Sequence, residues 1–196
     1  VGHGDTIIME SCEYYNSFLS FFPTVAVILN IEADHMDFFK DLEDVKKSFR
    51  KFASLVPENG LVICNADDKN TMDTVNGIGS NIITFGIEND ADVMAKNIEC
   101  KHGMSNFDVY YRGEKYTSVS MHVPGLHNVK NALAASAAAI NGGISPECIS
   151  QALATFTGAG RRFEYKGSLN GAKVYDDYAH HPGEIHALID AAKSQD

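Results

Sequence analysis

The chain has 196 residues, of which 44% are hydrophobic and 21% are charged. This is an ordinary globular composition, with room for one sizeable core, or for one domain and part of another. The formal net charge of −10 argues against a general surface for nucleic acid or anionic membranes, because either would need a basic face. An anionic ligand is not excluded, since a metal ion and a few cationic side chains can reverse the field locally.

The four cysteines are far apart in the sequence, so they form no CxxC motif for metal or redox chemistry. There is no secretory signal and no apolar run long enough to span a membrane. We therefore expect a reduced, cytoplasmic protein without membrane insertion. The chain does not begin with methionine, and its last residues follow what looks like the first helix of a new unit. We expect it to be a piece of a longer protein.

The first half of the chain alternates apolar runs with helical patterns. Apolar residues spaced by three and four predict an amphipathic helix over residues 42–56, and a loop with a short helix begins at Ala66. Buried strands are predicted at residues 6–10, 24–29, 61–65 and 81–87. Strands that alternate with helices predict an α/β protein with a parallel sheet and helices on its faces.

The second half begins with a different pattern. Residues 92–123 alternate apolar and polar side chains around a turn at residues 112–114, which predicts antiparallel hairpins. An alanine-rich helix is predicted at residues 127–140, and Ser145 followed by proline opens another helix. Residues 173–193 read as strand, loop and helix, and we place a domain boundary near residue 160.

Carboxylates follow two of the predicted strands at their carboxyl ends. Glu10 ends the first strand, and the segment NIEADHMD (residues 30–37) follows the second with three carboxylates around His35. Ligands bind at this edge of open parallel sheets, and carboxylate oxygens suit magnesium. A solvated loop with surface ion pairs and helix-capping acids is the alternative, and these residues alone leave it open.

Three polar side chains stand at the start of the alanine-rich helix. They are His127, Asn128 and Asn131, and the two asparagines share one helix face. Carboxamides can read a base edge with paired donor and acceptor groups. A helix-capping network is the alternative reading.

Further polar groups follow the predicted domain boundary. Arg162 offers a planar guanidinium of the kind that pairs with phosphate, and Asp177 follows a strand where it could accept from ribose hydroxyls. His180 and His181 follow Tyr178 and precede a proline and a helix start, where the two histidines could hold a carboxylate or phosphate. A solvated linker and a strand-end cap remain the alternative.

The order of the motifs resembles the Mur ligase family from about residue 7 to the end of the chain. The NIEADHMD, RRFE and DDYAHHP forms are similar to its alanine-adding branch. The motifs that carry the resemblance are ESCEYYNSFLSF, ILNIEADHMDFF, PGLHNVKNALAA, GAGRRFE and VYDDYAHHPGE.

The resemblance implies a ligase of peptidoglycan precursor synthesis that uses ATP and magnesium. Its substrates would be UDP-N-acetylmuramate and L-alanine, joined through an acyl phosphate. The implied fold is α/β: a central mostly parallel sheet flanked by helices, with a small antiparallel hairpin subdomain, followed by the start of a Rossmann-like C-terminal domain. Residues 1–160 would form the central ATP-binding domain, and residues 161–196 would begin the amino-acid-binding domain.

The resemblance also implies roles for the metal and adenine ends of the site. Glu10 and His35 would be catalytic by holding magnesium near the reacting phosphate. Asn128 and Asn131 would contact the adenine end of ATP, and His127 would support their loop.

The remaining implied roles fall beyond the predicted domain boundary. Arg162 would approach the ATP phosphates and Asp177 the ribose. Tyr178 and His180 would face the muramoyl or amino-acid substrate.

One departure from the family pattern concerns the phosphate loop. The family holds ATP phosphates with a GxxGKT/S loop, whereas residues 2–6 have no lysine and precede a predicted strand. We therefore expect this chain alone neither to turn over nor to bind the UDP-sugar well. The alternatives are a peptide-recycling ligase acting on the same sugar nucleotide, a folylpolyglutamate synthetase-like ligase, a non-catalytic nucleotide-binding module and a metal hydrolase.

Overall fold

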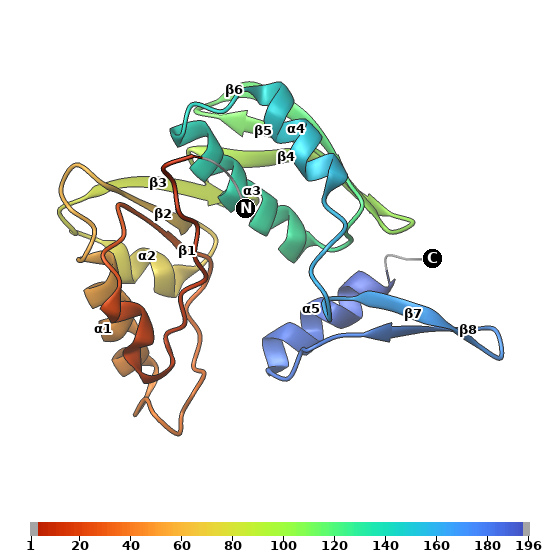
Figure 1. Cartoon of the computed structure of the whole chain (residues 1–196), viewed down its shortest axis with the longest axis horizontal. Coiled ribbons are helices and arrows are strands. Elements are labelled where there is room, and N and C mark those ends of the chain that lie inside the picture. Colours follow the sequence, from red (N-terminus) through yellow and green to blue (C-terminus); the bar gives the residue numbers. More distant parts are fainter. Residues whose placement is uncertain (1–3, 194–196) are drawn as a thin grey trace.

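The fold is built around one six-stranded sheet with helices on both faces (Figure 1). It is taken from a computed structural model that describes residues 4–193. Residues 2 and 3, which belong to the segment compared above with the family's phosphate loop, therefore lie outside the described residues. The strands run in the order β1 (Val25–Ile28), β2 (Leu61–Asn65), β3 (Asn81–Gly86), β4 (Val93–Lys101), β5 (Met104–Tyr111) and β6 (Glu114–Met121).

The sheet is parallel at one end and antiparallel at the other. The pairings from β1 to β4 are parallel, and those from β4 to β6 are antiparallel. The parallel part and the antiparallel hairpins were both predicted from the pattern of the sequence, and both are confirmed. The hairpins extend the parallel sheet, because β3 pairs with β4 through Phe85 and Val93.

Strand β2 lies at the centre of the two hydrophobic layers. All its residues are buried, as expected of an inner strand of a parallel sheet covered on both faces. Val62 belongs to the cluster under helices α1 (Leu42–Ala53) and α2 (Lys69–Val75). Ile63, the next residue along, belongs to the cluster under helix α3 (Leu126–Asn141). Helix α4 (Pro146–Thr155) packs beside β6.

The predicted strand at residues 6–10 is wrong. The structure has no strand there, and the side chains of Ile7 and Ile8 are 83% and 94% exposed. Strand β1 pairs only with β2 within residues 4–193, so this apolar run has neither a backbone partner nor an opposing layer. A 3₁₀ helix that the sequence analysis did not predict follows at Tyr14–Ser20, and its Phe18 ring stacks on Phe52 of α1.

The C-terminal part forms a small separate sheet and a helix. Strands β7 (Glu164–Leu169) and β8 (Ala172–Asp176) pair antiparallel, and helix α5 (Pro182–Lys193) follows. This confirms the predicted strand, loop and helix of residues 173–193. Across residues 4–193, no helix combines the length and the apolar character that crossing a membrane would require. The domain boundary near residue 160 stays a prediction.

Candidate functional site

The loop after β1 brings two carboxylates against one imidazole. The Nε2 atom of His35 lies 3.3 Å from Glu13 Oε1 and 3.9 Å from Asp34 Oδ2. One potential ligand atom from each of the three residues lies within 4.8 Å of the others, and all three side chains are partly buried. This donor set and spacing fit a divalent cation, although an ion pair without a metal would use the same contacts.

Aromatic stacking orients the His35 ring toward these carboxylates. His35 has a left-handed φ of 53°, and its ring stacks on Tyr14 with centroids 4.4 Å apart. The Tyr14 hydroxyl donates a hydrogen bond to Asp37, which raises the pKa of Tyr14 above its ordinary value. Because Tyr14 begins the 3₁₀ helix, the same contact carries its neighbour Glu13 to His35.

Glu10 occupies a different position from the one that Glu13 takes. It is exposed in the segment before the 3₁₀ helix, and its carboxylate makes no hydrogen bond or ion pair with any residue between 4 and 193. The sequence analysis overlooked Glu13. It is the second glutamate of the ESCEY motif, and its place in the same motif as Glu10 was the signal that could have identified it. Glu10 as a metal ligand remains a prediction.

The start of α3 presents the two predicted asparagines. Gly125 precedes the helix with φ +99°, and a Cβ there would lie 2.7 Å from His127 Cε1, so a larger residue would be strained twice over. The Asn128 amide donates to the carbonyl of Pro124 at 2.7 Å, which is a capping contact. Asn131 donates to Asn128 Oδ1 at a long 3.5 Å, so its carboxamide is only weakly engaged.

His127 lies where α3 meets the C-terminal part. Desolvation lowers the pKa of His127 below its ordinary value; nearby Asp177 opposes this shift, and Arg162 adds to it. The residue as a whole remains exposed to solvent. His127, Asp177 and Arg162 are therefore neighbours, and His127 is expected to be neutral at pH 7.

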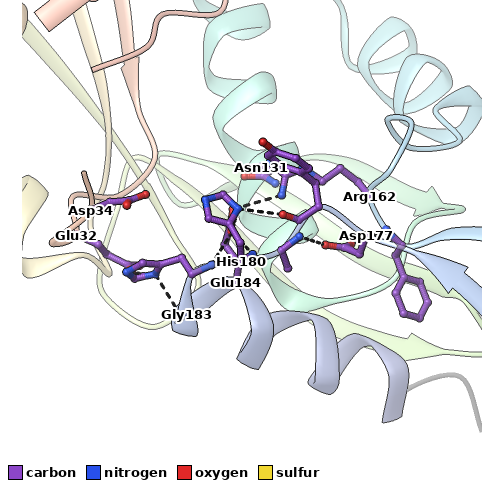
Figure 2. Close-up of polar contacts among 12 residues, drawn as sticks. Glu32, Asp34, Asn131, Arg162, Asp177, His180, Gly183 and Glu184 are labelled. Atoms are coloured by element: carbon purple, nitrogen blue, oxygen red, sulfur yellow. Dashed lines mark hydrogen bonds and ion pairs between the residues drawn. The ribbon is translucent and has the colours of Figure 1, made fainter. Parts of the chain in front are cut away.

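Glu184 organises the loop before α5. Its carboxylate accepts hydrogen bonds from the backbone N–H groups of His180 (3.1 Å) and His181 (3.2 Å), and it pairs with Arg162 at 3.3 Å (Figure 2). Burial raises the pKa of Glu184, but these donors outweigh it and the net shift is downward. The arrangement keeps a carboxylate beside the predicted phosphate-binding arginine.

Asp177 braces the same loop. Its two oxygens accept from the N–H groups of Phe163 and Ala179, each at 2.7 Å. The Tyr178 side chain is 53% exposed, and the guanidinium of Arg161 lies over its ring at 4.8 Å. The sequence analysis named the strand-end cap as the alternative role for Asp177, and the structure shows that contact.

A cleft of about 210 Å³ separates the loop after β1 from the loop before α5. His181 Nδ1 lies 3.3 Å from Glu32 Oε2 across it, and a Cβ on Gly183 would come 3.0 Å from the same oxygen. Figure 2 shows Glu32 and Asp34 on one side and the C-terminal residues on the other. The lining residues are Glu13, Asn30, Glu32, Asp34, Val45, Phe49, His181 and Glu184. Because four of them are carboxylates, an anionic ligand would need a cation here.

Comparison of the sequence with family models and with curated proteins identifies the family. The description "Mur ligase middle domain" matches residues 2–139, and "Mur ligase, glutamate ligase domain" matches residues 161–196. A curated relative from Clostridium novyi (strain NT), named UDP-N-acetylmuramate–L-alanine ligase, is 48% identical over 194 residues. The match covers 99% of this chain and 42% of the relative, so the chain spans less than half the length of that protein.

Solved structures agree with the sequence matches. The ligase MurF from Acinetobacter baumannii superposes with a TM-score of 0.81 at 26% identity, covering 92% of this chain and 39% of that one. The UDP-N-acetylmuramate-alanine ligase MurC of Thermotoga maritima gives a TM-score of 0.76 at 28% identity, covering 92% and 40%. The ordered motifs, the site at the carboxyl edge of the sheet and these matches lead to one conclusion: the chain belongs to the Mur ligase family.

Proposed function

We propose that this chain is part of an ATP-dependent ligase that joins UDP-N-acetylmuramate to L-alanine in peptidoglycan precursor synthesis in the cytoplasm. The carrying observation is the cleft, where the acid–histidine cluster after β1 faces the loop before α5. The 48% identity to a ligase of that name supports this choice of substrates. In the proposed reaction the muramoyl carboxylate takes a phosphoryl group from ATP, the amine of L-alanine attacks the acyl phosphate, and phosphate leaves.

The trio Glu13, Asp34 and His35 fits a magnesium ion by its donor atoms and spacing. When bound, the ion would supply positive charge to offset the charges of a carboxylate and a phosphate brought together. Glu10, the ligand named from the motif, is the alternative to Glu13, and the variants described below distinguish the two.

The other side of the cleft would hold the nucleotide. Arg162 already pairs with a carboxylate, so binding phosphate exchanges one anionic partner for another. Asn128 and Asn131 would present carboxamides to adenine. Asp177 would lie near the ribose while its oxygens brace the loop.

Tyr178 and His180 would contact the muramoyl or amino-acid substrate. Tyr178 is exposed, and the His180 ring nitrogen Nδ1 lies 3.0 Å from the carbonyl of Tyr178. This contact orients the imidazole relative to the tyrosine, and within residues 4–193 its Nε2 makes no hydrogen bond or ion pair.

The test uses the whole protein that carries this chain. Phosphate release would be followed with ATP, magnesium and UDP-N-acetylmuramate, adding L-alanine or a cell-wall peptide in turn. We expect release that depends on L-alanine. Release with the peptide alone would move the protein to the recycling ligases, and no release with either would favour a non-catalytic nucleotide-binding module.

The metal site has its own matched pair of variants. Glu13→Gln should weaken Mn²⁺ binding, measured by electron paramagnetic resonance, by about tenfold, since it removes one charged ligand oxygen. Glu10→Gln is the control from the same motif and should change binding less than twofold if Glu13 is the ligand. The reverse result would return the role to Glu10.

A further inference from the structure

A buried carboxylate just after β2 has a complete set of partners. Asp67 accepts hydrogen bonds from the backbone N–H groups of Ile87 (2.8 Å), Glu88 (3.0 Å) and Asn89 (2.8 Å). Its fourth partner is the ammonium group of Lys130 at 3.0 Å. The Asp67 side chain is only 3% exposed, so these four contacts replace its hydration.

These contacts keep Asp67 ionised. Burial raises its pKa, but the loop N–H groups and Lys130 outweigh burial and the net shift is downward. The arrangement also needs Gly86, because a Cβ there would lie 2.9 Å from Asp67 Oδ1. The ionised Asp67 carboxylate therefore binds both the loop after β3 and the first turns of α3.

Lys130 lies in α3 between the two asparagines of the proposed adenine site. The N-cap residue of α3 is Gly125, which has no side chain to cap the helix. The charged hydrogen bond from Lys130 to Asp67 instead ties this part of α3 to the carboxyl ends of β2 and β3. Besides the hydrogen bonds that the two asparagines make themselves, this end of α3 therefore has a tether from the residue between them.

We propose that Lys130, through Asp67, is a positioning residue for the nucleotide-binding end of α3, which sets where Asn128 and Asn131 present their carboxamides. The inference rests on the proposed function, since adenine binding at these asparagines belongs to that proposal. The contact joins two side chains of this chain, Lys130 Nζ and Asp67 Oδ2 at 3.0 Å, and an internal contact of this kind preorganises a binding group.

The test compares Lys130→Met with Lys130→Arg in the whole ligase. Methionine keeps the stem and loses the charge, while arginine keeps a cation that can reach Asp67. Lys130→Met should raise the KM for ATP about tenfold, leave the KM for L-alanine and kcat within about twofold, and lower the preference for ATP over inosine triphosphate. Lys130→Arg should restore most of the ATP preference.

Three outcomes decide the matter, with Asn131→Ala as the reference variant. If Asn131→Ala changes the ATP preference and Lys130→Met does not, the inference is overturned and the proposed adenine site stands. If Asn131→Ala leaves the preference unchanged, the adenine site fails and the inference fails with it. If Lys130→Met loses activity equally with ATP and inosine triphosphate, and the KM for ATP does not rise selectively, Lys130 has only a structural role and the inference is overturned. Should Lys130→Met not fold, Asp67→Asn carries the same expectation.

Discussion

Replacing Leu133 with alanine measures how firmly α3 is held to the sheet. Leu133 is fully buried, and it packs in the cluster that includes Ile63 and Phe85 of the central strands. The substitution removes three side-chain carbons from a close-packed layer, and such changes cost the transfer free energy of the lost atoms plus the free energy of the cavity left behind. We expect the free energy of unfolding to fall by about 3 kcal/mol.

The assay is urea unfolding followed by far-ultraviolet circular dichroism. With a slope of about 2 kcal/mol per molar urea, the midpoint should fall by about 1.5 M. Leu126→Ala, in the first turn of the same helix, is the matched control because Leu126 is 55% exposed. Its cost should stay within about 0.5 kcal/mol. Equal losses for the two variants would refute the assignment of Leu133 to the core.

Three further predictions concern charge, capping and reactivity. Lys115 and neighbouring donors lower the pKa of Asp108 from 3.8 to about 2, so its contribution to stability should be present above pH 3.8 and lost as the pH falls through 2. When the free energy of unfolding is measured against pH, Asp108→Asn should lack the part of the slope that this carboxylate contributes. An unchanged slope would contradict the lowered pKa. Asp41→Ala removes the N-cap of α1, whose side chain accepts an N–H at 2.9 Å, and should cost about 1 kcal/mol in urea unfolding; no loss would exclude the cap. Burial raises the pKa of Cys64 to about 12, so a thiol reagent at pH 8 should label exposed Cys12 and spare Cys64 until unfolding; early labelling of Cys64 would show that the strand opens.

The local pattern was sufficient for most of the secondary structure. The continuous apolar run at residues 61–65 predicted a strand buried on both faces, and β2 is one. Apolar residues at helical spacing predicted α1, which ends at Ala53, three residues before the predicted end. Ser145 followed by proline predicted the start of α4. These features depend on neighbours a few residues away, so the chain itself carries the information.

The run at residues 6–10 shows where that information ends. Its apolar residues are as suited to a strand as those of β1, but a strand also needs a partner for its backbone groups. Whether a partner exists depends on the rest of the fold. The same reasoning covers Glu10 and Glu13, which lie three residues apart, because only the turn of the 3₁₀ helix and the stacking of Tyr14 on His35 decide which one faces the imidazole.

The family could be read from the resemblance of the ordered motifs, and the candidate site residues from side-chain types that can serve a metal, a phosphate or a base. The pairing of Asp67 with Lys130 and of Glu32 with His181 could not be read in this way. Each pair joins ionisable side chains that are far apart along the chain, and nothing in the sequence links one to the other. They come within hydrogen-bond or ion-pair distance only because the packing of helices on the sheet brings them together, and the energy of a charge pair depends on that distance and on its burial.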